Sequence, residues 1–145
     1  MAANSRLTIA THALAWLALA HRRGQAVLTS EEVAASVNTN PVVIRRSLGD
    51  LHRAGLVEVR RGAGAGWSLA RAPERITLFD VYEAVERDPL FALHHTEPSL
   101  ECPVGRGVRP VLGQIYGDVA EVLRRELTRT SIAQVLRDTL EQAQT

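Results

Sequence analysis

The chain has 145 residues, 46% hydrophobic and 23% charged, a composition typical of one folded domain or of one domain with an accessory element. Its single cysteine, Cys102, excludes an internal disulfide framework and any metal or cluster site made only of cysteines from one chain. The net charge of +1 divides unevenly along the chain. Residues 1–71 hold nine arginines and four acidic residues, a net of +5, whereas residues 72–145 hold eight arginines and twelve acidic residues, a net of −4. Only the first half therefore suits binding to a polyanion.

Residues 6–22 predict the first helix. Apolar residues fall on most of its sides, which indicates a helix that is buried on most sides. The uncharged run from Leu7 to His21 is shorter than the roughly 20 residues of a membrane-spanning helix. It also imitates a secretory signal, but the elements that follow are typical of an intracellular DNA-binding unit. We therefore expect a cytoplasmic protein with no membrane partner.

Residues 29–54 predict a helix–turn–helix. Thr29 followed by Glu32 forms a capping-box pattern, which begins a short helix that runs through Val37. After a turn, Asn40 and Pro41 supply a cap and a first residue for a second helix that ends near Ala54. Its apolar stripe consists of Ile44, Leu48 and Leu51.

Residues 56–69 predict a β-hairpin. Residues 56–60 alternate as a strand, residues 61–66 form a glycine-rich turn, and residues 67–69 begin the return strand. The glycines do not complete G-x-G-x-x-G and precede a strand rather than a helix, so a nucleotide site is not expected. Helix, helix–turn–helix and hairpin together indicate a mainly α fold with a small β-hairpin wing, that is, a winged helix–turn–helix over residues 1–72.

DNA contact is expected at the second helix of this unit, because its first turn enters the major groove in helix–turn–helix proteins. The candidate residues lie outside the core stripe and are Thr39, Asn40, Val42, Arg45 and Arg46. Arginine can pair with guanine, and threonine and valine can contact a thymine methyl group. In the wing, Arg60, Arg61 and Gly64 are expected to meet the DNA backbone or the minor groove. The alternative is a solvated polar face with incidental charges.

The second half of the chain predicts a linker around Pro73, a helix from Thr77 to about Pro89, a loop over 88–107 and two further helices. We divide it into a linker helix and sensor loop, 73–107, and dimerisation helices, 108–145. Within the long helix expected from Val108 to Arg129, apolar residues recur at 4-3-4-3 spacing, which is typical of a coiled-coil seam. They are Val108, Leu112, Ile115, Val119 and Val122. This seam predicts a homodimer; burial within one subunit is the alternative.

Cys102 lies in the expected loop, just before the long helix. A thiol just before a helix can be redox-active; the alternative is an inert thiol. His94, His95 and Glu97 could join Cys102 as metal ligands, but their spacing fits no standard zinc motif, so no metal is expected. No residue set supports nucleophilic catalysis, and we expect no enzyme activity.

Several motifs, taken in order, resemble the Rrf2 family of bacterial winged-helix regulators, the IscR, NsrR and CymR type. They are residues 37–46 (VNTNPVVIRR), the helix exit 54–57 (AGLV), the wing 61–70 (RGAGAGWSLA) and the following helix, 76–86. The resemblance covers nearly the whole chain. It implies a homodimer that represses promoters through palindromic operators, with a sensor loop before the dimerisation helix.

The same resemblance bears on cofactors, because cluster-bearing members of the family place three cysteines in the sensor loop. This chain has only Cys102 there, so an iron–sulfur cluster of that kind is not expected and no cofactor is predicted. His12 could offer a ligand from the first helix. The chain looks more like the single-cysteine members, which leaves Cys102 as a thiol that could respond to oxidants.

The sequence therefore predicts a repressor that binds double-stranded DNA as a homodimer on a palindromic operator. Its two recognition helices would enter successive major grooves about 34 Å apart. A change at Cys102 would shift the long helices and spoil that spacing. The alternative is a winged-helix module that binds another protein without reading DNA.

Overall fold

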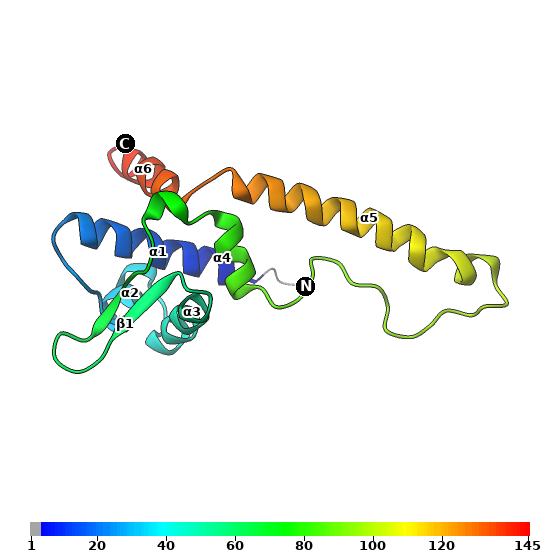
Figure 1. Ribbon diagram of the computed structural model, residues 1–145, viewed down its shortest axis with the longest axis horizontal. Helices are drawn as coiled ribbons and strands as arrows, with labels where there is room; N and C mark the ends of the chain where they lie inside the picture. The colour runs from blue at the N-terminus through cyan, green and yellow to red at the C-terminus, as the bar shows by residue number, and fades with distance from the viewer. Residues whose placement is uncertain (1–3) are drawn as a thin grey trace.

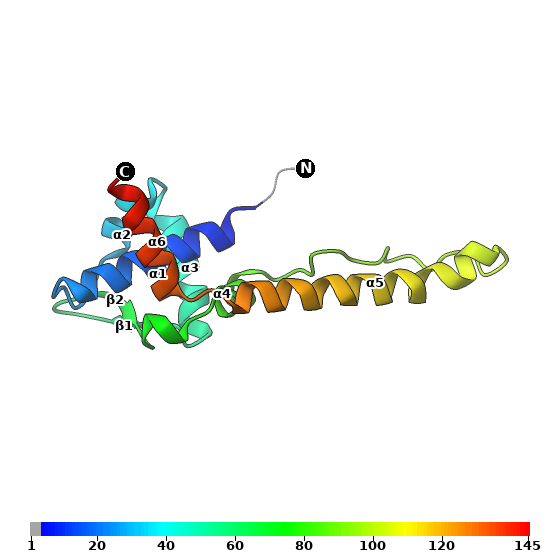
Figure 2. The ribbon, with the colours of Figure 1, turned by 90° about the horizontal axis from the view of Figure 1, so that it is seen from above.

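A computed structural model describes residues 4–145. In chain order the elements are α1 (Arg6–Arg22), α2 (Ser30–Val37), α3 (Pro41–Arg53), β1 (Val57–Arg60), β2 (Gly66–Leu69), the 3₁₀ helix η1 (Pro73–Arg75), α4 (Leu78–Val85), α5 (Pro103–Thr128) and α6 (Ile132–Ala143). Figure 1 shows a rounded part made of α1–α4, the hairpin and α6, which we call the head, and a long projection made of α5 and the loop 86–102, which we call the stalk. Figure 2 shows the loop running back alongside α5.

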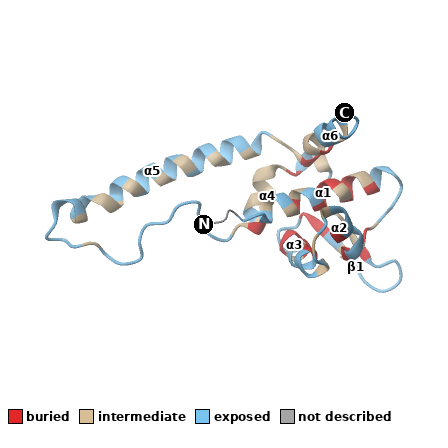
Figure 3. Cartoon of the chain, turned by 180° about the vertical axis from the view of Figure 1, so that it is seen from behind, coloured by how far each residue is buried: buried red, intermediate tan, exposed pale blue. Residues whose placement is uncertain are grey.

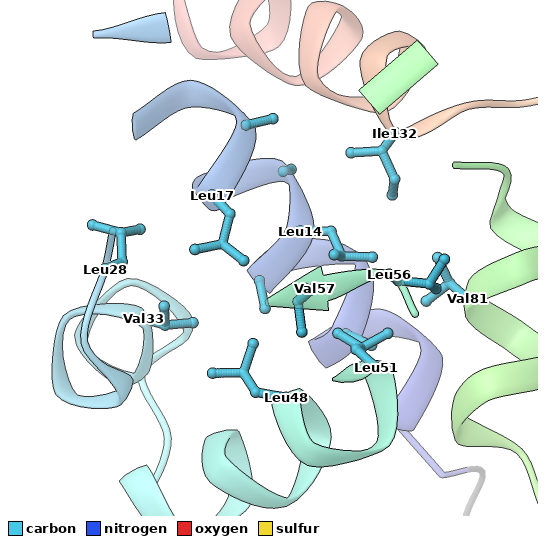
Figure 4. Packing of buried hydrophobic residues seen from close by; sticks show 14 of the residues in the cluster. Leu14, Leu17, Leu28, Val33, Leu48, Leu51, Leu56, Val57, Val81 and Ile132 are labelled. Atoms are coloured by element: carbon cyan, nitrogen blue, oxygen red, sulfur yellow. The ribbon is translucent and has the colours of Figure 1, made fainter. Parts of the chain in front are cut away.

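The hydrophobic core lies in the head. Figure 3 shows buried residues in the head, and α5 contributes none of them. Helix α1 passes through the centre and buries residues on most of its sides, as its sequence predicts. Figure 4 shows Leu14 of α1 facing Leu51 of α3 and Val57 of β1, with Val81 and Ile132 approaching from α4 and α6.

The predicted helix–turn–helix is confirmed. The Thr29 hydroxyl accepts from the Glu32 N–H at 3.1 Å and the Glu32 carboxylate accepts from the Thr29 N–H at 3.1 Å, so the capping box is complete. The Asn40 side chain caps α3 by accepting from the Val42 N–H at 2.8 Å, with Pro41 in the first turn. Ile44, Leu48 and Leu51 are fully buried, so the predicted stripe anchors α3 to the core.

The predicted wing is also confirmed. Strands β1 and β2 pair antiparallel, with Val57 opposite Leu69 and Arg60 opposite Gly66. Residue 67 also bridges back to the segment before α2, because Leu28 and Trp67 exchange backbone hydrogen bonds of 3.0 and 2.7 Å. The hairpin base is therefore tied to two parts of the head.

The last helix returns to the head. The segments before α4 and α6 form a short antiparallel bridge, in which Leu78 N–H donates to Thr130 at 2.9 Å and Ile132 N–H donates to Ile76 at 2.8 Å. Helix α6 then packs against α1 and buries Ile132 and Leu136. The C-terminal helix thus completes the core around α1, and α5 with the loop 86–102 forms the projecting stalk.

The predicted start of the long helix at Val108 is wrong, because α5 begins at Pro103. Pro103 in the first turn is compatible with a helix start, and the glycines after it do not break the helix. A Cβ at Gly105 would lie 2.0 Å from the backbone oxygen of Ser99, so glycine there lets the loop close against the new helix. No helix within residues 4–145 combines the length and hydrophobicity needed to cross a membrane.

Candidate nucleic-acid interface

Helix α3 presents a polar face to solvent on the side opposite its buried stripe. Val42 is 52% exposed, and Arg45 and Arg46 are exposed beside it. An exposed valine beside two arginines offers both a surface for a thymine methyl group and donors for guanine. These three predicted contact residues therefore lie together on one accessible surface.

Thr39 and Asn40 lie in the turn before α3, but they are not equally free. Asn40 uses its side-chain oxygen to cap the helix, so its amide donors are the part left for a ligand. Thr39 is half-buried, and its N–H donates to Ala34 at 3.1 Å. Asn38 adopts a left-handed conformation with φ 63°, which reverses the chain between α2 and α3.

The two adjacent arginines of α3 differ in their partners. Arg45 Nη1 lies 3.2 Å from Glu31 Oε1 on α2, and both side chains are at least half exposed. Arg46 forms no ion pair with any residue from 4 to 145. Arg46 is thus the more available cation for an incoming anion.

The wing carries the remaining predicted contacts on its exposed end. Arg60, Arg61 and Gly64 are all exposed, and neither arginine forms an ion pair within the described residues. Gly64 adopts φ 71°, and Arg60 Nη1 passes 3.9 Å from the place a Cβ would occupy there. Figure 1 shows α3 and the wing on the same side of the head, opposite α6. The structure thus brings both predicted contact groups to one face.

The base of the wing is fixed by residues that the sequence did not single out. The Trp67 indole donates to Ser30 Oγ at 3.2 Å and meets the His52 ring edge-on, with centroids 6.3 Å apart. A Cβ at Gly66 would lie 2.8 Å from the Leu28 oxygen, so only glycine allows this close approach. Trp67 thus sets the position of the wing relative to α2 and α3.

The predicted sensor residue, Cys102, and the candidate ligands His94 and His95 lie in the stalk. Cys102 is exposed and occupies the N-cap position of α5 without a side-chain hydrogen bond. The rings of His94 and His95 lie 4.6 Å apart, yet no group of three His, Cys, Asp or Glu side chains within residues 4–145 could hold a metal. His12 is far along the chain and pairs with Ser36 Oγ at 2.9 Å.

The predicted seam of α5 is only partly covered. Val108, Leu112 and Val119 are half-buried, whereas Ile115 and Val122 are 48% and 60% exposed. One edge of the helix is covered by the loop of the same chain. The ring centroids of Phe91 and Tyr116 lie 5.4 Å apart, and Arg109 donates to the His94 carbonyl at 2.9 Å. The neighbouring apolar strip, made of Val104, Val111, Ile115 and Val122, is exposed.

Comparison with known proteins agrees with this geometry. The model of a family described as Rrf2, an iron-dependent transcriptional regulator, matches residues 3–138. YwnA of Bacillus subtilis, named as an HTH-type transcriptional regulator, is 37% identical over 134 residues, which are 92% of this chain and 96% of YwnA.

Solved structures share the fold. The T. potens IscR structure has a TM-score of 0.71 at 21% identity and covers all of this chain and 92% of its own. CymR of B. subtilis, described as the global cysteine regulator, has a TM-score of 0.64 at 23% identity and covers 94% of this chain and 97% of its own. At these identities the likeness concerns the fold alone.

The iron dependence in the family description can be tested against the residues of this chain. Cys102 is the only cysteine, and within residues 4–145 no three His, Cys, Asp or Glu side chains converge. One chain therefore does not supply the donor set of a three-cysteine cluster.

Proposed function

The chain belongs to the Rrf2 family of transcriptional regulators, and from that premise we propose that it is a homodimeric repressor that reads a palindromic operator. Proteins of this family are regulators rather than enzymes, and this chain carries their DNA-binding winged helix. The observation that carries the proposal is the shared face of α3 and the wing, where Arg46, Arg60 and Arg61 are exposed and unpaired within residues 4–145.

The chemistry of that face supports sequence-specific binding. Arg46 and Val42 on α3 match the donor and methyl contacts available in a major groove. Arg60 and Arg61 at the wing suit the phosphate backbone, which positions a protein without reading sequence. The proposed division of labour is base reading by α3 and backbone contact by the wing.

The exposed strip on α5 supports the homodimer. Four large apolar side chains repeat along one side of a helix that leaves the core, and such a surface is costly to leave in water. A second copy of the same helix would cover it with like side chains and relate two heads by a two-fold axis. Helix α5 has 26 residues, which corresponds to a length of about 39 Å at 1.5 Å per residue. This length is comparable to the distance of about 34 Å between successive major grooves.

We also propose that oxidation of Cys102 alters operator binding. The thiol is exposed and sits where the loop turns into α5, so a bulky or charged oxidation product there would act on the start of the dimer helix. The test compares operator affinity before and after peroxide treatment in the unvaried protein and in Cys102→Ser. If peroxide lowers the affinity of both proteins to the same extent, the redox proposal is wrong.

The main proposal is tested by selecting bound duplexes from a random-sequence pool and measuring the mass of the complex by analytical ultracentrifugation. We expect one enriched palindrome with half-sites about one helical turn apart, bound by two chains. In-vitro transcription from a promoter containing that palindrome should fall as protein is added. An unenriched pool would contradict operator reading, and a single bound chain would contradict the dimer.

A further inference from the structure

A buried carboxylate gathers two arginines at the edge of α3. Asp50 lies on α3 with its side chain only 8% exposed. Its Oδ1 accepts from Arg87 Nη2 at 2.7 Å and also from Arg53. Arg53 belongs to the last turn of α3, whereas Arg87 follows α4, so residues 37 positions apart meet on one oxygen atom.

This cluster carries an excess of positive charge. The Arg53 and Arg87 side chains are 67% and 68% exposed, while the single carboxylate that they share is buried. Glu86, the residue before Arg87, is already paired with Arg6 at 3.3 Å and accepts from Asn4. One negative charge therefore faces two guanidinium groups, whose ten N–H donors exceed what Asp50 can accept.

The cluster also lies beside the surface proposed to read DNA. Figure 1 shows the end of α4 and the wing on opposite flanks of α3. Asp50, Arg46 and Arg6 line one pocket of about 100 Å³ between α1, α3 and α4, so the cluster adjoins Arg46, which is proposed to contact DNA. A duplex held by α3 and the wing would have its backbone close to this flank.

We infer that Arg53 and Arg87, held together by Asp50, bind a phosphodiester of the DNA backbone on the side of α3 away from the wing. Two converging guanidinium groups offer charge-assisted hydrogen bonds to phosphate oxygens, which is the ligand chemistry that arginine favours. Asp50 is a positioning residue, because it fixes both cations before the anion arrives. The inference rests on the proposed function and adds a contact from outside residues 1–72.

The test uses the full chain and fluorescence anisotropy with two 30-base-pair duplexes, one selected from a random pool and one of unrelated sequence. Binding is measured between 50 and 200 mM salt for the unvaried protein, Arg87→Gln and Arg53→Gln. Each variant leaves Asp50 one partner, so the fold is expected to persist, and thermal unfolding checks it. The matched control is Arg137→Gln, an exposed arginine of α6 on the opposite side of the head.

We expect the slope of log K against log salt to become shallower by about 0.9 for each cluster variant, equally on both duplexes. Arg87→Lys should restore most of the slope, and Arg137→Gln should leave it unchanged. If the unvaried protein binds both duplexes and both glutamine variants keep its slope of log K against log salt, this inference is wrong but the proposed function is not contradicted. Failure of the unvaried protein to bind either duplex overturns both.

A free anion could use the same donors. If 10 mM inorganic phosphate raises the melting temperature of the unvaried protein but not of Arg87→Gln, while the DNA salt slope is equal in both, the cluster binds free phosphate and the DNA assignment is wrong. If phosphate changes neither melting temperature and the slope falls in Arg87→Gln, the DNA backbone is the ligand.

Discussion

The guanidinium of Arg45 lies 3.2 Å from the carboxylate of Glu31, so an ion pair joins α3, the helix proposed to read DNA, to the helix before it. Arg46, the next residue, has no such partner within residues 4–145. In the proposed complex the two arginines would therefore approach DNA differently, Arg45 from an ion pair with Glu31 and Arg46 without one. Arg45 must exchange one anion for another, whereas Arg46 gains an anion without losing one.

The first prediction follows from this difference. Arg46→Ala should weaken binding to the selected operator by about 1–3 kcal/mol, roughly 5- to 150-fold, and Arg45→Ala should weaken it less. Anisotropy titrations at fixed salt measure both, with Arg137→Ala as the control. Equal losses for the two α3 variants would show that the Glu31 pair does not matter, and no loss for either would contradict the docking of α3.

The second prediction concerns the wing. Arg61→Ala should reduce the salt slope by about 0.9 on operator and unrelated duplexes alike, because a phosphate contact carries no sequence information. The ratio of the two affinities at one salt concentration should stay within about twofold. A change in that ratio without a change in slope would assign Arg61 to base reading instead.

The third prediction concerns the fit of the hairpin against the segment before α2. Gly66→Ala should lower the free energy of unfolding by about 1–3 kcal/mol, because the new Cβ would lie 2.8 Å from the Leu28 oxygen. Urea unfolding followed by circular dichroism measures it. The control is Gly113→Ala on α5, where nothing lies within 4 Å of the added methyl group and helix propensity favours alanine.

The fourth prediction concerns the exposed strip of α5. Ile115→Glu should convert the dimer to monomer at micromolar concentration, because it places a charge among the apolar side chains that a partner helix would bury. Sedimentation velocity reports the change. Gly113→Glu puts the same charge on another side of the helix and should leave the dimer intact. If both variants stay dimeric, the interface lies elsewhere.

The fifth prediction concerns the start of α2 and its pH dependence. The backbone N–H of Thr29 and the amide of Gln25 donate to Glu32 and hold the pKa of its carboxyl below the ordinary value of 4.5. A lowered folded-state pKa stabilises the fold above pH 4.5, and this stabilisation disappears as the pH falls through the lowered value.

Glu32→Gln removes the charge that the Thr29 N–H and the Gln25 amide stabilise, so it should lower the free energy of unfolding by about 0.3–1 kcal/mol at pH 7. The difference from the unvaried protein should shrink below pH 4. Urea unfolding at both pH values measures it, and Glu31→Gln, which lies outside the capping box, serves as the control. A difference that stays constant with pH would show that the charge of Glu32 does not stabilise the start of α2.

The sequence predicted the helix–turn–helix and wing because their determinants are local. Thr29, Asn40 and Pro41 act on backbone groups within three residues, and the stripe on α3 repeats within one helix. The exposed contact residues could be proposed for the same reason: they are what remains once the buried stripe is assigned.

The start of α5 and the Asp50 cluster could not be predicted, because both depend on contacts between distant segments. In the sequence, the glycines at 105 and 107 indicate a loop. The close approach of Ser99 to Gly105, which explains a glycine inside the helix, is seen only in the structure. Asp50 looks like an ordinary surface residue of α3, and its burial becomes apparent only when Arg87 is placed beside it. A single acidic residue on an otherwise basic helix is the signal that the sequence offers.

The return of α6 to the head has a consequence for synthesis. Ile132 and Leu136 complete the core around α1, yet a ribosome makes them after the whole stalk. A nascent chain that stops before residue 132 leaves the apolar flank of α1 exposed to water. We expect such a chain to be more sensitive to proteases than the full chain.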